Sequence, residues 1–354
     1  MSPFRRHWRE IAGAFLRLGA TSYGGFAIMG VMQAELQERR GWVTRPRFVE
    51  GLAVVNMLPG ATATQMAIFL AYARGGWWGG IVGGLCFVLP AFVIMLGLAV
   101  AYATVGVSPV VRGALYGLGP VVIGVFLAAI YRLGRATVRG VAQAAIAVAA
   151  ALVVLYAWWS ATPPASVAVA DVAAEAQPAT LGELAVFFFK VGAFTVGGGL
   201  AMLAFIQQHV VEQLHWLTPR EFVDGLALGQ LTPGPILMLA AYVGFRVAGV
   251  AGAAVAAGAA FLPSFVLMVA VLPVLDRVRA LVWVRAVMEG VGPAVIGILA
   301  VSLVRLAPHA VPDLPAAVML AATLAALLLT RIGPFRLIAA GALAGVLRER
   351  LVRA

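Results

Sequence analysis

Long apolar stretches alternate with short polar segments along this chain. Residues 81–103 and 249–273 carry no charge, and Gln143 is the only strongly polar residue in the segment 141–159. At about 1.5 Å per residue, helices of this length cross a hydrocarbon core of roughly 30 Å. The pattern predicts an all-α polytopic membrane protein.

The composition agrees and excludes several other classes of protein. Hydrophobic residues make up 63% of the chain and charged residues 11%, against about 25% charged residues in soluble domains. The single cysteine, Cys86, excludes an intrachain disulfide or a thiolate cluster, and the four histidines lack metal-ligand spacing. The net charge of +11 comes from short loops, which indicates membrane topology and not a nucleic-acid partner. We expect no metal and no cofactor.

The second half of the chain repeats the first at a nearly constant offset. RFVEGLAVVNMLPG at 47–60 and EFVDGLALGQLTPG at 221–234 are identical at seven of fourteen positions, and GLGPVVIG at 117–124 aligns with GVGPAVIG at 290–297. The segment between the halves has three prolines, two acids and no base, which is typical of an exposed linker. The predicted organisation is an N-terminal membrane repeat at 1–159, a linker at 160–180 and a C-terminal membrane repeat at 181–354.

The arginines of the loops predict that the two repeats have inverted topology. Loop 35–47 holds four arginines and its counterpart 209–221 holds one, whereas the next loop pair reverses this bias. Short arginine-rich loops stay cytoplasmic, so equivalent loops lie on opposite sides. We expect segments 11–35 and 48–72 to enter the membrane and return to the same side. The alternative makes every apolar segment a simple span and places the four-arginine loop outside.

Two Pro-Gly sequences, NMLPGATATQ and QLTPGPILML, interrupt apolar stretches near their middles. Proline ends a helix and glycine allows the chain to reverse. Irregular backbone at that depth needs protein or a watery cavity around it, and paired broken helices meeting at the midplane mark transporter sites. A simple helix kink is the alternative, but the double occurrence favours a site. The candidate binding residues here are Asn56, Pro59, Gly60, Thr62, Thr64, Gln230, Pro233 and Gly234.

Arg17 and Lys190 occupy equivalent positions, each about seven residues into an apolar segment and each followed by glycines. A charge at this depth usually faces a cavity or the bundle interior, although a long side chain can also reach the membrane surface. Two cations, together with helix N-termini freed by the glycines, suit an anion. The further candidates for this site are Gly24, Gly25, Thr195, Gly197 and Gly198.

The aligned carboxylates Glu50 and Asp224 allow two interpretations. Thr218 and Glu221 form a capping-box pattern that predicts a helix start, where a carboxylate such as Asp224 is stabilised anyway. Alternatively, both carboxylates couple transport to protons, with Glu289 as a weaker candidate for the same role.

Four motifs resemble the long, two-domain form of the chromate ion transporter family: FLRLGATSYGGFAIMG, FVEGLAVVNMLPGATATQ, FFKVGAFTVGGGLAML and EFVDGLALGQLTPGPI. The resemblance covers nearly the whole chain. It implies a bacterial inner-membrane secondary transporter that moves chromate outward, with sulfate as the structural look-alike, and it places the substrate at the candidate residues named above. Its partners are then the oxyanion and membrane lipid, with a homodimer as one option for the assembly.

Other functions stay open at this stage. A sulfate uptake carrier or an anion channel uses the same chemistry, and a cation transporter is an alternative if Glu50, Asp224 and Glu289 line the path. An intramembrane enzyme requires a nucleophile with a base, or a metal, and the sequence has no such motif. We therefore expect no enzymatic activity.

Overall fold

The computed structural model is mostly helical in the part of the chain that it describes and has no strand there, which confirms the all-α class. Among the described residues, three helical segments are long and apolar enough to cross a membrane: Thr62–Thr104, Val110–Tyr131 and Ile236–Val271. The described residues are 3–22, 27–104, 109–138, 140–161, 179–194, 199–274, 296–297, 300–301, 303–304, 307–308, 310–330, 332 and 334–353.

The chain forms two compact units, and each of them draws on both sequence halves. Unit 1 contains Met1–Val107, Thr180–Met202 and Gly225–Arg285, and unit 2 contains the remaining segments. The compact units and the sequence repeats are therefore different divisions of the same chain.

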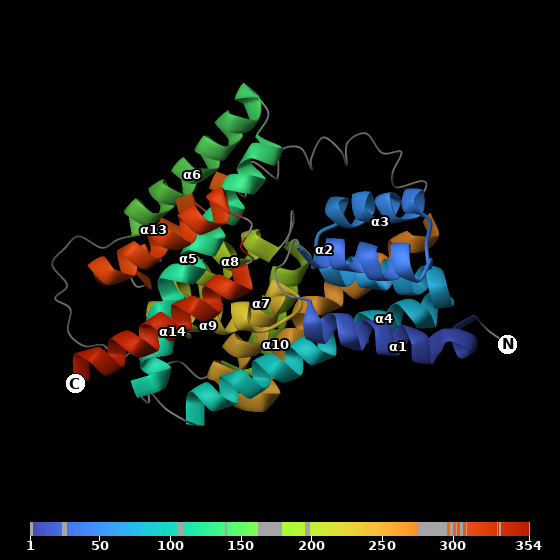
Figure 1. Cartoon of the computed structure of the whole chain (residues 1–354). Coiled ribbons are helices and arrows are strands. Elements are labelled where there is room, and N and C mark those ends of the chain that lie inside the picture. The colour runs from blue at the N-terminus through green and yellow to red at the C-terminus, as the bar shows by residue number, and fades with distance from the viewer. Residues whose placement is uncertain are drawn as a thin grey trace. The chain divides into compact units, whose positions relative to one another are not determined.

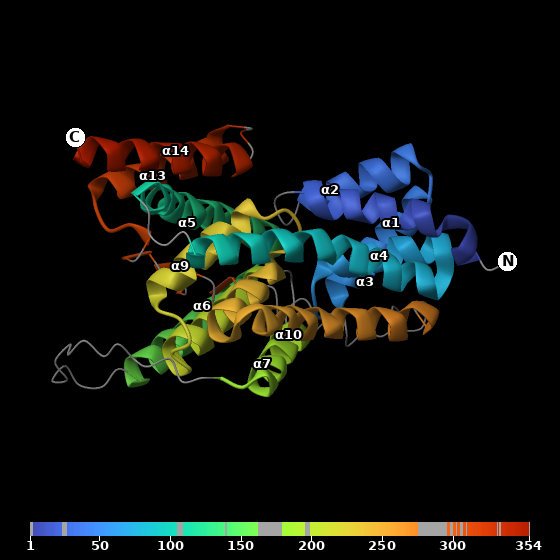
Figure 2. The same cartoon turned by 90° about the horizontal axis from the view of Figure 1, so that it is seen from below.

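In unit 1, α1 packs along α4, α7 packs along α10, and α4 contacts α10 (Figures 1 and 2). The helices of this unit are α1 (Pro3–Thr21), α2 (Ala27–Met32), η1 (Gln33–Arg39), α3 (Arg45–Met57), α4 (Thr62–Thr104), α7 (Leu181–Phe194), the start of α8 (Gly199–Gln207), the end of α9 (Pro219–Leu231), η3 (Ile236–Met238), α10 (Leu239–Val271) and η4 (Leu272–Val274).

Both α4 and α10 are bent into helical hairpins at equivalent glycines. Gly76 has φ 65° and ψ −155°, and Gly249, its counterpart in the second repeat, has φ 60° and ψ −152°. This left-handed region is open to glycine and strained for most other residues. In α4 the second arm, residues 77–104, folds back on the first arm, residues 62–75, so that Gly84 lies against Ile68.

The same close helix contact is also made twice. Gly19 of α1 lies so near the backbone of Phe87 that a Cβ would collide with the Phe87 carbonyl oxygen, and Gly192 of α7 meets the Ala260 carbonyl in the same way. Gly192 and Ala260 are the repeat equivalents of Gly19 and Phe87. The duplicated sequence therefore folds twice into the same local structure.

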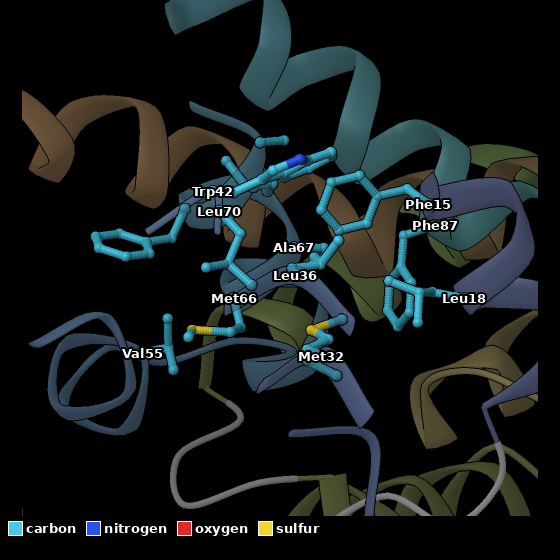
Figure 3. Close-up of a cluster of buried hydrophobic side chains, with 14 of the residues drawn as sticks. Phe15, Leu18, Met32, Leu36, Trp42, Val55, Met66, Ala67, Leu70 and Phe87 are labelled. Carbon is cyan, nitrogen blue, oxygen red and sulfur yellow. The ribbon is translucent and has the colours of Figure 1, made fainter. Parts of the chain in front are cut away.

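A cluster of buried apolar side chains joins α1, α2, η1, α3 and α4 (Figure 3). At its edge the Glu10 carboxylate accepts hydrogen bonds from Trp42 Nε1 at 2.9 Å and from Arg74 at 3.0 Å. Glu10 lies in the first half of α1, Trp42 follows η1, and Arg74 ends the first arm of α4. These hydrogen bonds therefore bring together three residues that flank the predicted re-entrant segments 11–35 and 48–72. The labelled members of the cluster are Phe15, Leu18, Met32, Leu36, Trp42, Val55, Met66, Ala67, Leu70 and Phe87.

In unit 2, α5 packs against both α13 and α14. Gly113 and Gly117 of α5 face Gly341 and Gly345 of α14, so that each helix brings a glycine pair spaced by four residues to the contact. Small residues at this spacing let membrane helices approach to backbone contact. The helices of unit 2 include α5 (Pro109–Thr137), α6 (Val141–Ala161), η2 (Gln208–Gln213), α13 (Leu314–Leu329) and α14 (Pro334–Arg353).

Asp313 links α5, α13 and α14 of unit 2 through hydrogen bonds. It caps α13 by accepting from the Ala316 N–H at 3.0 Å, and it also accepts from Arg348 of α14 at 2.7 Å and from the Tyr116 hydroxyl of α5. The hydrogen bond from Tyr116, followed by the Ala316 amide and the Arg348 charge, lowers the pKa of Asp313.

We expect Asp313→Asn to destabilise the protein and to weaken the pH dependence of its stability. Because the folded-state pKa is lowered, the contribution of Asp313 is present above the unfolded-state pKa of about 3.9 and is lost as the pH falls through the folded value. Thermal melts in detergent from about pH 7 to about pH 3 test this. Glu38→Gln, at an exposed carboxylate of η1, is the control. Identical pH profiles for Asp313→Asn and the wild type would contradict the assignment.

Candidate functional site

The chain leaves the helix at both Pro-Gly sequences, as predicted. We call residues 58–61, between α3 and α4, the first break, and residues 232–235, between α9 and η3, the second break. Gly60 has φ 124° and Gly234 has φ 104°. Both values lie in the region that favours glycine, so each break depends on its glycine.

The chain reverses direction at each break. Gly51 of α3 lies directly against the ring of Phe69 in the first arm of α4, and the equivalent Gly225 of α9 lies against the ring of Tyr242 in α10. The helices on the two sides of a break therefore pack against each other, with glycine leaving room for the aromatic ring.

Each break packs against a long helix of the other sequence half. The Ala61 N–H of the first break donates to Ser264 Oγ of α10 at 2.8 Å. At the second break, a Cβ on Gly234 would lie 2.7 Å from the Cβ of Ala91 in α4. Ala91 and Ser264 occupy equivalent positions of the two repeats. Ala91 lies near the middle of the second arm of α4, so the second break meets that helix at about half its length.

All of the described residues predicted to bind substrate fall within unit 1, although they come from both halves of the sequence. Thr64 is fully buried, Pro233 is buried, and Gln230 is half-buried. Asn56 is exposed, and its side-chain amide donates back to the Leu52 carbonyl of the same helix at 2.8 Å. Six predicted residues lie outside the described part of the chain: Gly24, Gly25, Thr195, Gly197, Gly198 and Glu289.

The two cations have equivalent surroundings. Arg17 lies four residues before the end of α1, and Lys190 lies four residues before the end of α7. Gly19 and Gly192, two residues further on, contact the long helices, so both cations project from the opposite helix faces and are exposed. Among the described residues neither cation forms an ion pair, whereas Arg74 of the same unit is paired with a glutamate.

The two aligned carboxylates are each neutralised by an arginine of their own helix. Arg47 Nη1 lies 2.8 Å from Glu50 in α3, and Arg220 Nε lies 3.4 Å from the buried Asp224 in α9. The predicted helix start is confirmed, because the Thr218 N–H donates to Glu221 at 2.9 Å and the Glu221 N–H donates to Thr218 Oγ1 at 3.2 Å.

Three residues at the breaks were not found from the sequence. Ser264 accepts from the first break, Gln65 Nε2 donates to the Pro59 carbonyl at 2.7 Å, and the Ser22 carbonyl accepts from the Gly234 N–H at 2.8 Å. One signal was available for Ser264, which is the lone hydroxyl in the apolar stretch 249–273. The contact of Ser22 depends on a partner in the other half of the chain and has no local signal.

These features define a helical membrane protein in which two chain breaks pack against long apolar helices, an arrangement that transporters use to build their sites. The chain belongs to the chromate transporter family, whose sequence model matches it twice, at residues 9–174 and 182–346.

Several relatives are similar over most of their length. A chromate transport protein of Cupriavidus metallidurans is 33% identical over 351 residues, covering 90% of this chain and 88% of the relative. A probable chromate transport protein of Synechococcus elongatus is 32% identical over 343 residues, covering 87% and 86% respectively. A shorter, uncharacterized transporter of Bacillus subtilis is 30% identical over 134 residues, which is 38% of this chain and 68% of the relative. No solved structure matches.

Proposed function

We propose that this protein is a multi-pass secondary transporter that moves chromate out of the cell across the bacterial inner membrane. Membership of the chromate transporter family supports this, as do relatives at 32–33% identity that are named chromate transport proteins. The family of transport proteins also favours a role other than that of an enzyme.

The observation that carries the site proposal is the symmetric pair of cations without an ion-pair partner among the described residues, Arg17 and Lys190, in the same unit as both breaks. A tetrahedral dianion must exchange its water shell for hydrogen-bond donors and positive charge. Arginine can donate to two oxyanion oxygens at once, whereas lysine acts as a point charge. Helix N-termini at the breaks add N–H groups and the positive end of a helix dipole.

We further propose that the two sequence halves are inverted and that alternating access moves one against the other. In unit 1, Trp77 at the start of the second arm of α4 packs on Tyr72, 5.4 Å between ring centroids. Near the end of that arm, Tyr102 packs on Tyr242, and its ring centroid lies 6.0 Å from the Arg246 guanidinium, close to the α10 turn. The two hairpin turns therefore lie toward opposite ends of one long helix, as expected for inverted halves.

A sulfate or related oxyanion uptake carrier and an anion channel are the second candidates, because chromate and sulfate have the same charge and a similar shape. The carboxylates proposed for proton coupling are Glu50, Asp224 and Glu289. The arginine partners of the first two favour a fixed structural charge, which makes coupling through them a secondary proposal.

The test is radiolabelled chromate and sulfate flux in proteoliposomes under imposed pH, sodium and voltage gradients. A carrier gives saturable chromate flux that a gradient can drive uphill. Flux that does not saturate and only follows the electrochemical gradient of the anion indicates a channel. The absence of any oxyanion flux from correctly inserted protein would contradict the proposal.

A further inference from the structure

Three buried side chains at the first break carry oxygen atoms that the fold leaves with spare acceptor capacity. Thr64, Gln65 and Ser264 are each 0% exposed. Thr64 Oγ1 and Gln65 Oε1 have no hydrogen-bond partner in the described structure, and Ser264 Oγ accepts only the Ala61 N–H. A buried polar atom without a partner is costly in free energy, and a bound water or ion is one explanation for such an atom.

The second break differs from the first at the aligned positions. One buried oxygen without a hydrogen-bond partner in the described structure also lies beside it, Ser22 Oγ, in the residue whose carbonyl accepts the Gly234 N–H. When the sequences of the two breaks are aligned, apolar residues in the second break stand where the first break has polar ones. Pro235, which has no backbone N–H, stands where the first break has Ala61. The replacements are Thr62 by Ile236, Thr64 by Met238, Gln65 by Leu239 and Ser264 by Ala91. Because the second break forms with apolar residues at the positions aligned with Thr64 and Gln65, Thr64 Oγ1 and Gln65 Oε1 are not required to form a break, whereas Ser264 Oγ is the acceptor of the Ala61 amide.

The side-chain amide of Gln65 favours a cationic ligand, whereas the hydroxyls of Thr64 and Ser264 can both donate and accept. Gln65 Nε2 already donates to the Pro59 carbonyl at 2.7 Å, so the unpartnered atom of this side chain, Oε1, can only accept. A lone acceptor repels an oxyanion and attracts a cation or a donor.

The chemistry of these groups also selects among cations. Amide, hydroxyl and carbonyl oxygens are ligands of hard metal ions, and unwound backbone carries the sodium sites of many transporters. The described residues contain no group of three acidic, histidine or cysteine side chains that could hold a metal ion, and divalent ions are normally held with the help of carboxylates. Amides and hydroxyls do not titrate near neutral pH, so these three groups cannot store a proton.

We propose that a sodium ion binds at the first break against Gln65 Oε1, Thr64 Oγ1 and Ser264 Oγ. The proposal that sodium is the coupling ion rests on the oxyanion transport proposed above. The proposal that sodium binds at the first break does not. The site makes the two breaks functionally different, because the positions of the second break aligned with Thr64, Gln65 and Ser264 hold apolar side chains.

The experiment is a binding assay with radioactive sodium on the purified full-length protein in detergent, with choline as the replacement cation and no oxyanion present. We expect saturable sodium binding by the wild type and at least a tenfold weaker affinity in Gln65→Leu and Ser264→Ala. Gln65→Glu keeps an acceptor oxygen and adds a negative charge but removes the Nε2 donor to the Pro59 carbonyl, so it should retain saturable sodium binding. Thr323→Val, which removes a buried hydroxyl of α13 in unit 2, should bind normally.

Several results would overturn the proposal. If the wild-type protein shows no saturable sodium binding, the oxygen atoms of Thr64, Gln65 and Ser264 bind water alone. Normal sodium affinity in folded Gln65→Leu protein removes the site from this break, and Gln65→Glu that loses sodium but gains anion binding contradicts the sign of the ligand. A sodium gradient that leaves chromate flux unchanged overturns the coupling role. Because the binding assay contains no oxyanion, a failure of chromate transport leaves its outcome unaffected.

Discussion

Arg17→Gln and Lys190→Gln will each lower chromate flux by about tenfold to a hundredfold in proteoliposomes. A hydrogen bond to a charged group contributes about 1.5–3 kcal/mol, and each 1.4 kcal/mol corresponds to about a tenfold change. Both side chains are exposed and make no ion pair among the described residues, so their removal should leave the fold intact. Initial rates of labelled chromate uptake, normalised to inserted protein, measure the effect.

The matched control for the cations is Arg39→Gln, which removes an exposed arginine that is paired with Glu35 in η1. We expect this variant to transport normally. Arg17→Glu separates the oxyanion proposal from a cation transporter, since reversal of the charge should abolish anion flux and would favour a cation. Normal flux in both glutamine variants would identify Arg17 and Lys190 as side chains that reach the membrane surface, and would leave the breaks as the only site.

The largest effect on stability is expected for Gly19→Leu and Gly192→Leu. A side chain at either position meets a backbone carbonyl, of Phe87 or Ala260, which cannot rotate away as a side chain would. Overpacking typically costs about 1–3 kcal/mol, and we expect the upper end or more because two helices must separate. Thermal melts and size-exclusion chromatography of the detergent-solubilised protein report the loss.

Gly13→Leu, on the same helix as Gly19, is the control for this effect. A Cβ at Gly13 has nothing within 4 Å, so the protein should melt close to the wild-type temperature. If Gly19→Leu and Gly13→Leu melt alike, the contact between α1 and α4 does not contribute as the structure indicates.

The parts of the fold that the sequence predicted are those governed by neighbours a few residues apart. Pro59-Gly60 and Pro233-Gly234 end their helices because proline and glycine act on their own backbone. The start of α9 follows from a capping box formed by Thr218 and Glu221. Hydrophobic length identified the second arm of α4, the stretch 249–271 of α10 and helix α6 in the same way.

The parts that escaped prediction depend on distant partners. The bond from Ala61 to Ser264 spans 203 residues. The outward direction of Arg17 is set by Gly19 packing on α4, which fixes the rotation of α1 about its axis. A sequence repeat shows that two segments share a structure, but it does not show that each packs on the partner of the other.

The pairing of Ala61 with Ser264 has a consequence for the ancestry of the chain. An ancestor assembled from two copies of the first half would place the Ala61 amide against the Ala91 methyl group, and would bury a donor without an acceptor at a cost of about 1–3 kcal/mol. Joining the halves in one gene lets a serine arise opposite the Ala61 amide in one repeat, and lets Pro235 remove the aligned amide in the other. Residues 61 and 264 are therefore matched to each other. A chimera that exchanges Ser264 for alanine and keeps Ala61 buries an amide donor without an acceptor.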